Sequence, residues 1–218
     1  MPYNRKAIRQ IKEVYSPVRK KISSRLNDFK QLWEKGTEEN IFSELVFCLL
    51  TPQSKAKTCW ESVGDINRGR HLYKAGVKAL SARLCNVRFR NNKARYIIEA
   101  RKKFSRGSRI NMRPLIDRFC DVQDLREWLV RNVKGIGYKE ASHFIRNIGK
   151  GQNVAILDRH VLKNLKIAGV IKGIPRSISR KTYFDIENRM KAFAKRIKIP
   201  LSHLDLALWY KETGDVFK

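Results

Sequence analysis

The chain has 218 residues, of which 48 are Lys or Arg and 20 are Asp or Glu, giving a formal charge of +28. An apolar share of 42% is ordinary for a folded domain and argues against intrinsic disorder. So large a charge repels itself in the compact state unless a polyanion binds, and the composition therefore favours a nucleic-acid partner over a merely basic soluble protein.

Membrane and metal sites are disfavoured by the same sequence. No stretch approaches the roughly 20 apolar residues that span a bilayer, and the N-terminus lacks the apolar run of a secretory signal. We therefore expect an intracellular, cytoplasmic protein associated with the nucleoid, with no membrane contact. The four cysteines form no C-x-x-C pair, so their spacing argues against a zinc ribbon or an iron–sulfur cluster. No metal or other cofactor is expected.

The first half of the chain is predicted to be helical. Residues 8–29 are polar with sparse apolar positions, which indicates a surface helix pair broken near Pro17. Thr37 can cap a helix whose body, residues 41–50, is apolar on nearly every side and should be buried. Ser54 is placed to cap the next helix.

Helical spacing continues to the C-terminus. Lys93 to Phe104 carries an apolar stripe, and Asp121 can cap a helix that bears Leu125. The basic segment 101–113 could be a solvated loop or a phosphate-contacting loop. No run alternates with period two for long enough to predict a sheet, so the fold class is all-α. Further helices are expected at 141–148, 161–168, 181–197 and 202–211.

A glycine hairpin joins two matched apolar helix faces between residues 125 and 148. Gly135 and Gly137 permit a tight reversal, and Ile136 between them should plug the turn into the core. Their amides open a helix whose dipole attracts an anion, which is a way to bind phosphate without reading sequence. The alternative is an ordinary helical hairpin.

These motifs resemble a known family of repair enzymes. The sequence is similar to the helix-hairpin-helix base-excision DNA glycosylases, and within them to the archaeal-type 8-oxoguanine DNA glycosylase/AP lyases. The resemblance is carried by FSELVFCLLTPQSKA, VRFRNNKARYIIEAR, VKGIGYKEASHFIRN, AILDRHVLKNL and LALWYKETG. It implies a bifunctional enzyme that acts on double-stranded DNA containing oxidised guanine.

The resemblance also implies roles for particular residues. Lys139 would be the nucleophile that attacks C1′, forms a Schiff base and leads to β-elimination, although a solvated helix lysine is the alternative. Asp158, a plausible helix N-cap as well, would stabilise positive charge on the sugar. His160 would contact phosphate, and Gln53 would fill the gap left by the flipped base, unless it is a plain polar loop residue.

Base recognition is assigned to three further positions by the same resemblance. Phe89 and Trp209 are candidates for stacking on the lesion, with core packing as their alternative. The C-terminal Lys218 would approach the lesion, whereas a frayed terminus would leave it free.

The expected architecture is a monomer of two helical domains with the active site in the cleft between them. One domain would hold residues 1–38 and 151–218, and the other residues 39–150 with the helix-hairpin-helix. Two rival functions stay open: a glycosylase for another damaged or mismatched base, and a non-enzymatic helix-hairpin-helix DNA-binding or basic RNA-binding protein. The pairing of Lys139 with Asp158 disfavours the non-enzymatic protein.

Overall fold

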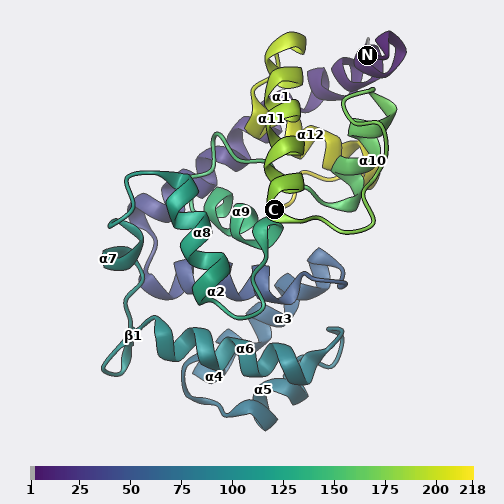
Figure 1. Cartoon of the computed structure of the whole chain (residues 1–218). Coiled ribbons are helices and arrows are strands. Elements are labelled where there is room, and N and C mark those ends of the chain that lie inside the picture. The colour runs from purple at the N-terminus through teal and green to yellow at the C-terminus, as the bar shows by residue number, and fades with distance from the viewer. Residues whose placement is uncertain (1–2) are drawn as a thin grey trace.

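The structure, a computed structural model, describes residues 3–218 and is mainly helical (Figure 1). Its first element, α1 (Arg5–Lys35), is one continuous helix that contains Pro17. The predicted break at Pro17 is therefore wrong. The helix continues because buried residues at helical spacing on both sides of Pro17 pack against the rest of the protein, which outweighs the lost backbone hydrogen bond. These residues are Ala7, Ile11, Val18, Ile22 and Phe29.

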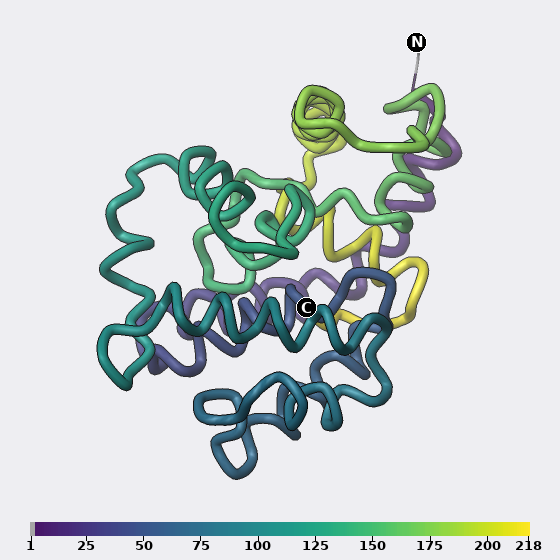
Figure 2. The backbone as a smooth tube through the Cα atoms, turned by 60° about the horizontal axis from the view of Figure 1, so that its bottom comes forward, coloured from purple at the N-terminus to yellow at the C-terminus, as the bar shows by residue number. Residues whose placement is uncertain are grey.

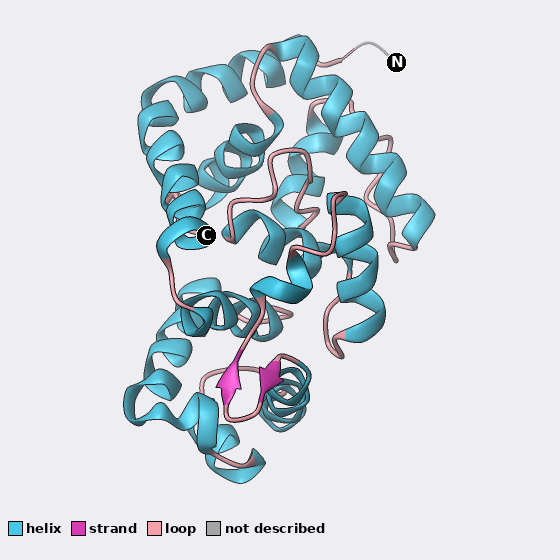
Figure 3. Cartoon of the chain, turned by 90° about the vertical axis from the view of Figure 1, so that its left-hand side faces the viewer, coloured by secondary structure: helices cyan, strands magenta, loops and turns pink. Residues whose placement is uncertain are grey.

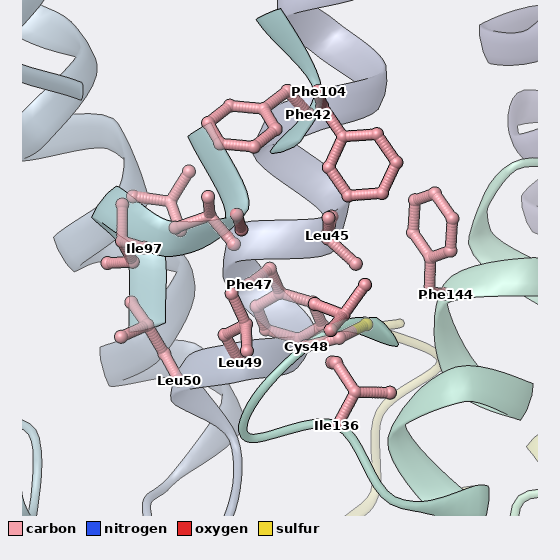
Figure 4. Close-up of a cluster of buried hydrophobic side chains, with 14 of the residues drawn as sticks. Phe42, Leu45, Phe47, Cys48, Leu49, Leu50, Ile97, Phe104, Ile136 and Phe144 are labelled. Carbon is pink, nitrogen blue, oxygen red and sulfur yellow. The ribbon is translucent and has the colours of Figure 1, made fainter. Parts of the chain in front are cut away.

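The central helix is α2 (Glu38–Leu50), and it is buried from Ile41 to Leu50 as predicted. Thr37 caps it reciprocally with Asn40: Thr37 Oγ1 accepts from the Asn40 N–H at 3.2 Å, and the Thr37 N–H donates to Asn40 Oδ1 at 3.0 Å. The side chains of α2 form the middle of the larger apolar core (Figure 4).

The larger core runs from Ile41 to Ile148 and is built by the helices that surround α2. Within its span lies the antiparallel hairpin of β1 (Ser105–Arg106) and β2 (Arg109–Ile110), which turns at Gly107 (Figure 3). The surrounding elements are α3 (Ala56–Asn67), the 3-10 turn η1 (Arg68–Arg70), α4 (His71–Lys74), α5 (Val77–Arg83), α6 (Arg90–Lys103), α7 (Arg113–Ile116), α8 (Val122–Asn132) and α9 (Tyr138–Asn147).

A second core forms where the start of α1 meets the last three helices. In Figure 1 these helices gather with the N-terminus at the top, and α3 to α6 lie at the bottom. A smaller apolar cluster lies where α1 packs on α12. The last three helices are α10 (Arg159–Ile167), α11 (Arg180–Ile197) and α12 (Leu201–Thr213).

Helix caps were predicted with mixed success. Asp121 caps α8 by accepting from the Gln123 N–H at 2.8 Å, as expected. Ser54 does not cap α3; the N-cap is Lys55, and Ser54 Oγ accepts the N–H of Arg88 at 3.1 Å instead. The all-α class is confirmed. Within residues 3–218, no helix has the length and apolarity to cross a membrane.

Candidate active site

The glycine hairpin between α8 and α9 has the expected form. Gly135 has φ +89°, and a Cβ there would overlap the ring of Tyr96. Both the backbone conformation and the lack of space therefore favour glycine at this position. Ile136 is buried and belongs to the larger core, where Figure 4 draws it. Gly137 is the N-cap of α9, and its N–H donates to Glu140 Oε2 at 3.2 Å.

Lys139 lies in the first turn of α9 with 25% of its side chain exposed. Its Nζ pairs with Glu140 Oε1 at 3.1 Å and donates to Thr51 Oγ1 at 3.4 Å. Because Thr51 follows the last residue of α2, the amine is held where the end of α2 meets the start of α9. It is anchored, yet reachable from solvent.

Asp158 is the N-cap of α10, as predicted, and accepts from the Val161 N–H at 2.8 Å. This bond leaves the carboxylate one stable partner in the absence of ligand. Among residues 3–218, the hydrogen bonds of Lys139 go to Thr51 and Glu140 and not to Asp158. The two groups are therefore not joined directly.

Two buried carboxylates anchor the segment that leads to Asp158. Asp205 Oδ1 accepts from the Ile156 N–H at 3.3 Å, and Glu187 Oε1 accepts from the Ala155 N–H at 2.8 Å. Burial raises the pKa of Asp205 to about 6; the charge of Asp158 adds to this rise, and an ion pair with Arg146 opposes it.

Arg146 connects this anchor to the helix of Lys139. Its Nη1 pairs with Asp205 Oδ2 at 2.6 Å, and both side chains are buried. Arg146 and Lys139 both belong to α9, so one ion pair ties the helix of the amine to α12 and, through Asp205, to the Asp158 segment. Sequence reasoning missed Arg146 and Asp205; the signal was an acid inside the apolar run Leu204–Leu208.

The C-terminal residue is packed against the core and is not frayed. Lys218 Nζ lies 3.6 Å from the ring centre of Trp60 and pairs with Glu44, and 10% of the side chain is exposed. Figure 2 shows the chain end returning to the middle of the molecule. Glu44 Oε2 in turn accepts from Asn147 Nδ2 at 2.9 Å, so the terminus is linked to α9.

His143 is a buried residue beside this region that sequence reasoning did not single out. Its ring packs edge-on against Phe47 at 5.3 Å, and neither ring nitrogen has a hydrogen-bond partner among the described residues. Burial lowers the pKa of His143 well below the usual value, and the charges of Arg146 and Lys139 add to the effect.

The remaining predicted residues lie at the surface or partly buried. Gln53 is exposed in the turn between α2 and α3, with φ +56°. Phe89 is 55% exposed with φ +59°, which excludes core packing. Trp209 is partly buried on α12. His160 Nδ1 lies 3.9 Å from Glu212 Oε2. Within residues 3–218, no three His, Cys, Asp or Glu residues are grouped to hold a metal ion.

The sequence matches a known family over most of its length. A family model described as 8-oxoguanine DNA glycosylase matches residues 22–199. An 8-oxoguanine DNA glycosylase/AP lyase of Fusobacterium nucleatum is 42% identical over 209 residues, which cover 96% of each chain. The protein of that name from Methanocaldococcus jannaschii is 38% identical over 214 residues, which cover 97% of this chain and 99% of the other.

Solved structures agree with the sequence matches. The crystal structure of the 8-oxoguanine DNA glycosylase of Thermotoga maritima has a TM-score of 0.85 at 34% identity and covers 97% of this chain and 98% of its own. The M. jannaschii glycosylase/lyase in complex with a 15mer DNA containing 8-oxoguanine has a TM-score of 0.86 at 36% identity, with 98% of each chain covered. On these grounds, the chain belongs to the 8-oxoguanine DNA glycosylase family.

Proposed function

We propose that the protein excises 8-oxoguanine from double-stranded DNA and then cleaves the strand at the same site, with Lys139 as the nucleophile. The observation that carries the proposal is the position of Lys139: a partly exposed amine in the first turn of α9, directly after the Gly135–Gly137 hairpin. A phosphate bound by the hairpin amides would bring a nucleotide close to that amine.

The chemistry uses the lysine in its neutral form, because an ammonium has no lone pair. With the nucleotide extruded from the stack, the nitrogen of Lys139 bonds to C1′ and the glycosidic bond breaks, so the bonding electrons leave with the base. Opening of the sugar ring yields a Schiff base. Loss of a C2′ proton then expels the 3′ oxygen with its phosphate, which cuts the strand.

Asp158 is proposed to stabilise the positive charge that builds on the sugar as the base departs. Its carboxylate accepts the Val161 N–H at 2.8 Å without DNA, so it is oriented before substrate arrives. Lys139 must exchange its contacts with Glu140 and Thr51 for the sugar, and this exchange would occur on DNA binding.

Further residues are proposed to hold the duplex and the lesion. Gln53 would enter the gap left by the extruded base, and the amides of the glycine hairpin and His160 would bind phosphate. Phe89 and Trp209 are proposed to stack on the base, and Lys218 to approach it. The exposure of Phe89 and the partial exposure of Trp209 support contact with a ligand from outside.

The two cores support a division into two domains, residues 1–38 with 151–218 and residues 39–150, with DNA bound between them. We propose that a monomer performs the reaction without metal or cofactor, because the amine supplies the nucleophile. The proposed location is inside the cell, at the nucleoid.

Borohydride trapping on an 8-oxoguanine duplex tests the proposal. Wild type should form a covalent protein–DNA adduct, and Lys139→Gln should form none while still binding the duplex. A set of duplexes with other lesions, each with four opposing bases, separates the rival glycosylases. Failure of wild type to trap any of them, despite tight binding, would favour the non-enzymatic DNA-binding protein.

A further inference from the structure

A buried lysine on α6 makes contacts that the proposed chemistry does not use. Lys93 is 3% exposed, and its Nζ donates to Leu50 O and Pro52 O at 2.7 Å each and to Ser54 Oγ at 3.1 Å. These three bonds use all three donors of an ammonium, and none goes to a carboxylate. Burying a cation is costly unless each of its donors has an acceptor, so the three acceptors hold the ammonium of Lys93 at one position.

The three acceptors define the turn between α2 and α3. Leu50 O belongs to the last residue of α2, where unpaired carbonyls and the helix dipole favour a cation. Pro52 and Ser54 flank Gln53, whose φ of +56° lies in the left-handed region. Such a backbone costs on the order of 1 kcal/mol for a non-glycine residue and persists only where its surroundings impose it.

A second strained turn is tied to the same point. Ser54 Oγ also accepts from the Arg88 N–H at 3.1 Å, and the next residue, Phe89, has φ +59°. Phe89 is the N-cap of α6, the helix that carries Lys93. The ammonium and the hydroxyl of Ser54 thus connect the turns that present Gln53 and Phe89 to solvent.

We propose that Lys93 is a positioning residue that holds the turns of Gln53 and Phe89 in the conformation that enters the DNA duplex. The inference rests on the proposed function, because it assigns both side chains to the duplex. Holding the strained turns before binding means that less ordering is required when DNA arrives, so affinity rises.

The position of Thr51 gives the turn a further connection. Thr51 Oγ1 accepts a hydrogen bond from Lys139 Nζ, and Thr51 lies between Leu50 and Pro52, whose carbonyl oxygens both accept from Lys93. The turn is therefore shared by the residues proposed to enter the duplex and by the proposed nucleophile.

The charge on Lys93 makes this tether sensitive to pH. Burial lowers the pKa of Lys93 to about 8; the nearby Cys59 thiol and the charge of Glu140 oppose this, and the charges of Lys139 and Arg88 add to it. A neutral amine has two donors and cannot make all three bonds. Above about pH 8 the tether should loosen while the rest of the fold is retained.

The test compares Lys93→Met with Lys78→Met, which removes one charge from an exposed position on α5. The duplex carries 8-oxoguanine with 2-aminopurine beside it, whose fluorescence reports unstacking. Lys93→Met should bind this duplex about tenfold more weakly than Lys78→Met, equivalent to about 1.4 kcal/mol, and give a smaller fluorescence rise. Single-turnover excision at saturating enzyme should fall by a smaller factor than binding.

The pH dependence separates positioning from stability. Between pH 7 and pH 9 the fluorescence rise should decline for wild type and Lys78→Met and stay flat for Lys93→Met. Equal affinity, equal fluorescence and the same pH response in the two methionine variants would overturn the inference.

A second variant covers the case in which Lys93→Met does not fold, as judged by circular dichroism. Ser54→Ala removes the hydroxyl that joins the two turns without changing the charge, and it should weaken binding in the same direction. If Lys93→Met is unfolded, unchanged binding by Ser54→Ala overturns the inference. Absence of excision by wild type would contradict the proposed function instead, so the two failures are distinguishable.

Discussion

Arg126 and Glu187 form a two-point ion pair in which Nη1 contacts Oε1 and Nη2 contacts Oε2, both at 2.8 Å, with neither side chain exposed. The pair joins α8, which precedes the glycine hairpin, to α11 of the second core. Glu187 also accepts the N–H of Ala155, on the way to Asp158. One buried carboxylate therefore links the helix that leads into the glycine hairpin to the segment that leads to Asp158.

Acid should unfold the protein partly through Glu187. Burial alone would raise the pKa of this carboxyl, but the hydrogen bonds and charge of Arg126 lower it overall. A lowered pKa contributes stability that is present above the pKa of unfolded glutamate, about 4.3, and lost as pH falls through the folded value. Urea unfolding of wild type and Glu187→Gln should therefore converge as pH falls below about 4.

At neutral pH, Arg126→Met should lower the free energy of unfolding by about 3–5 kcal/mol, because it leaves a buried carboxylate without its main partner. The double variant Arg126→Met/Glu187→Leu removes both charges and should regain part of that loss. A single variant as stable as wild type in urea would mean that Glu187 is satisfied without Arg126.

Gly135→Ala should damage the hairpin, and Gly173→Ala is the matched control. At Gly135 the added Cβ meets the Tyr96 ring at a positive φ, whereas at Gly173 nothing lies within 4 Å. We expect Gly135→Ala to lose about 1–3 kcal/mol of stability and to bind DNA more weakly, whatever the base sequence. Thermal unfolding and affinity for an undamaged duplex measure both effects; equal behaviour of the two variants would contradict the role of the hairpin.

Much of the fold could be predicted from local patterns. The caps at Thr37, Asp121 and Asp158 and the buried face of α2 depend on neighbouring residues, so the sequence alone reveals them. The predicted helix break at Pro17 was wrong because packing of α1 against α12 keeps the helix continuous, and this packing is not local in sequence. The predicted cap at Ser54 was wrong because its hydroxyl accepts a hydrogen bond from the backbone N–H of Arg88, 34 positions away.

The same distinction applies to the candidate site. Periodicity and residue type reveal the glycine hairpin, which is a short local motif, whereas the role of Lys139 beside it is implied by the family resemblance. Lys93 looks like any of the 48 basic residues until its acceptors, 39 to 43 positions away, are placed around it. His143 resembles a surface histidine on α9 in the same way, and only the folded core explains its burial.

Phe89→Gly should separate activity from stability. The ring is 55% exposed and the backbone has φ +59°, so glycine removes little packing and relieves about 1 kcal/mol of strain. Thermal unfolding should be unchanged or shifted upward, while excision from an 8-oxoguanine duplex falls about tenfold or more through lost stacking. Phe89→Ala keeps the backbone strain, so its excision rate should fall by the same factor while its thermal stability does not rise. Full excision activity in either variant would show that Phe89 does not contact the lesion.

Asp158→Asn should separate the helix cap from the catalytic charge. Asparagine caps helices about as well as aspartate, so its side-chain oxygen can still accept from the Val161 N–H, and stability should change by less than about 0.5 kcal/mol. The amide cannot stabilise a cationic sugar, and single-turnover excision should fall by a factor on the order of 100 or more. Asp158→Ala, which loses both functions, should also lose about 1 kcal/mol of stability. Excision at the wild-type rate by a well-folded Asp158→Asn would limit Asp158 to capping α10.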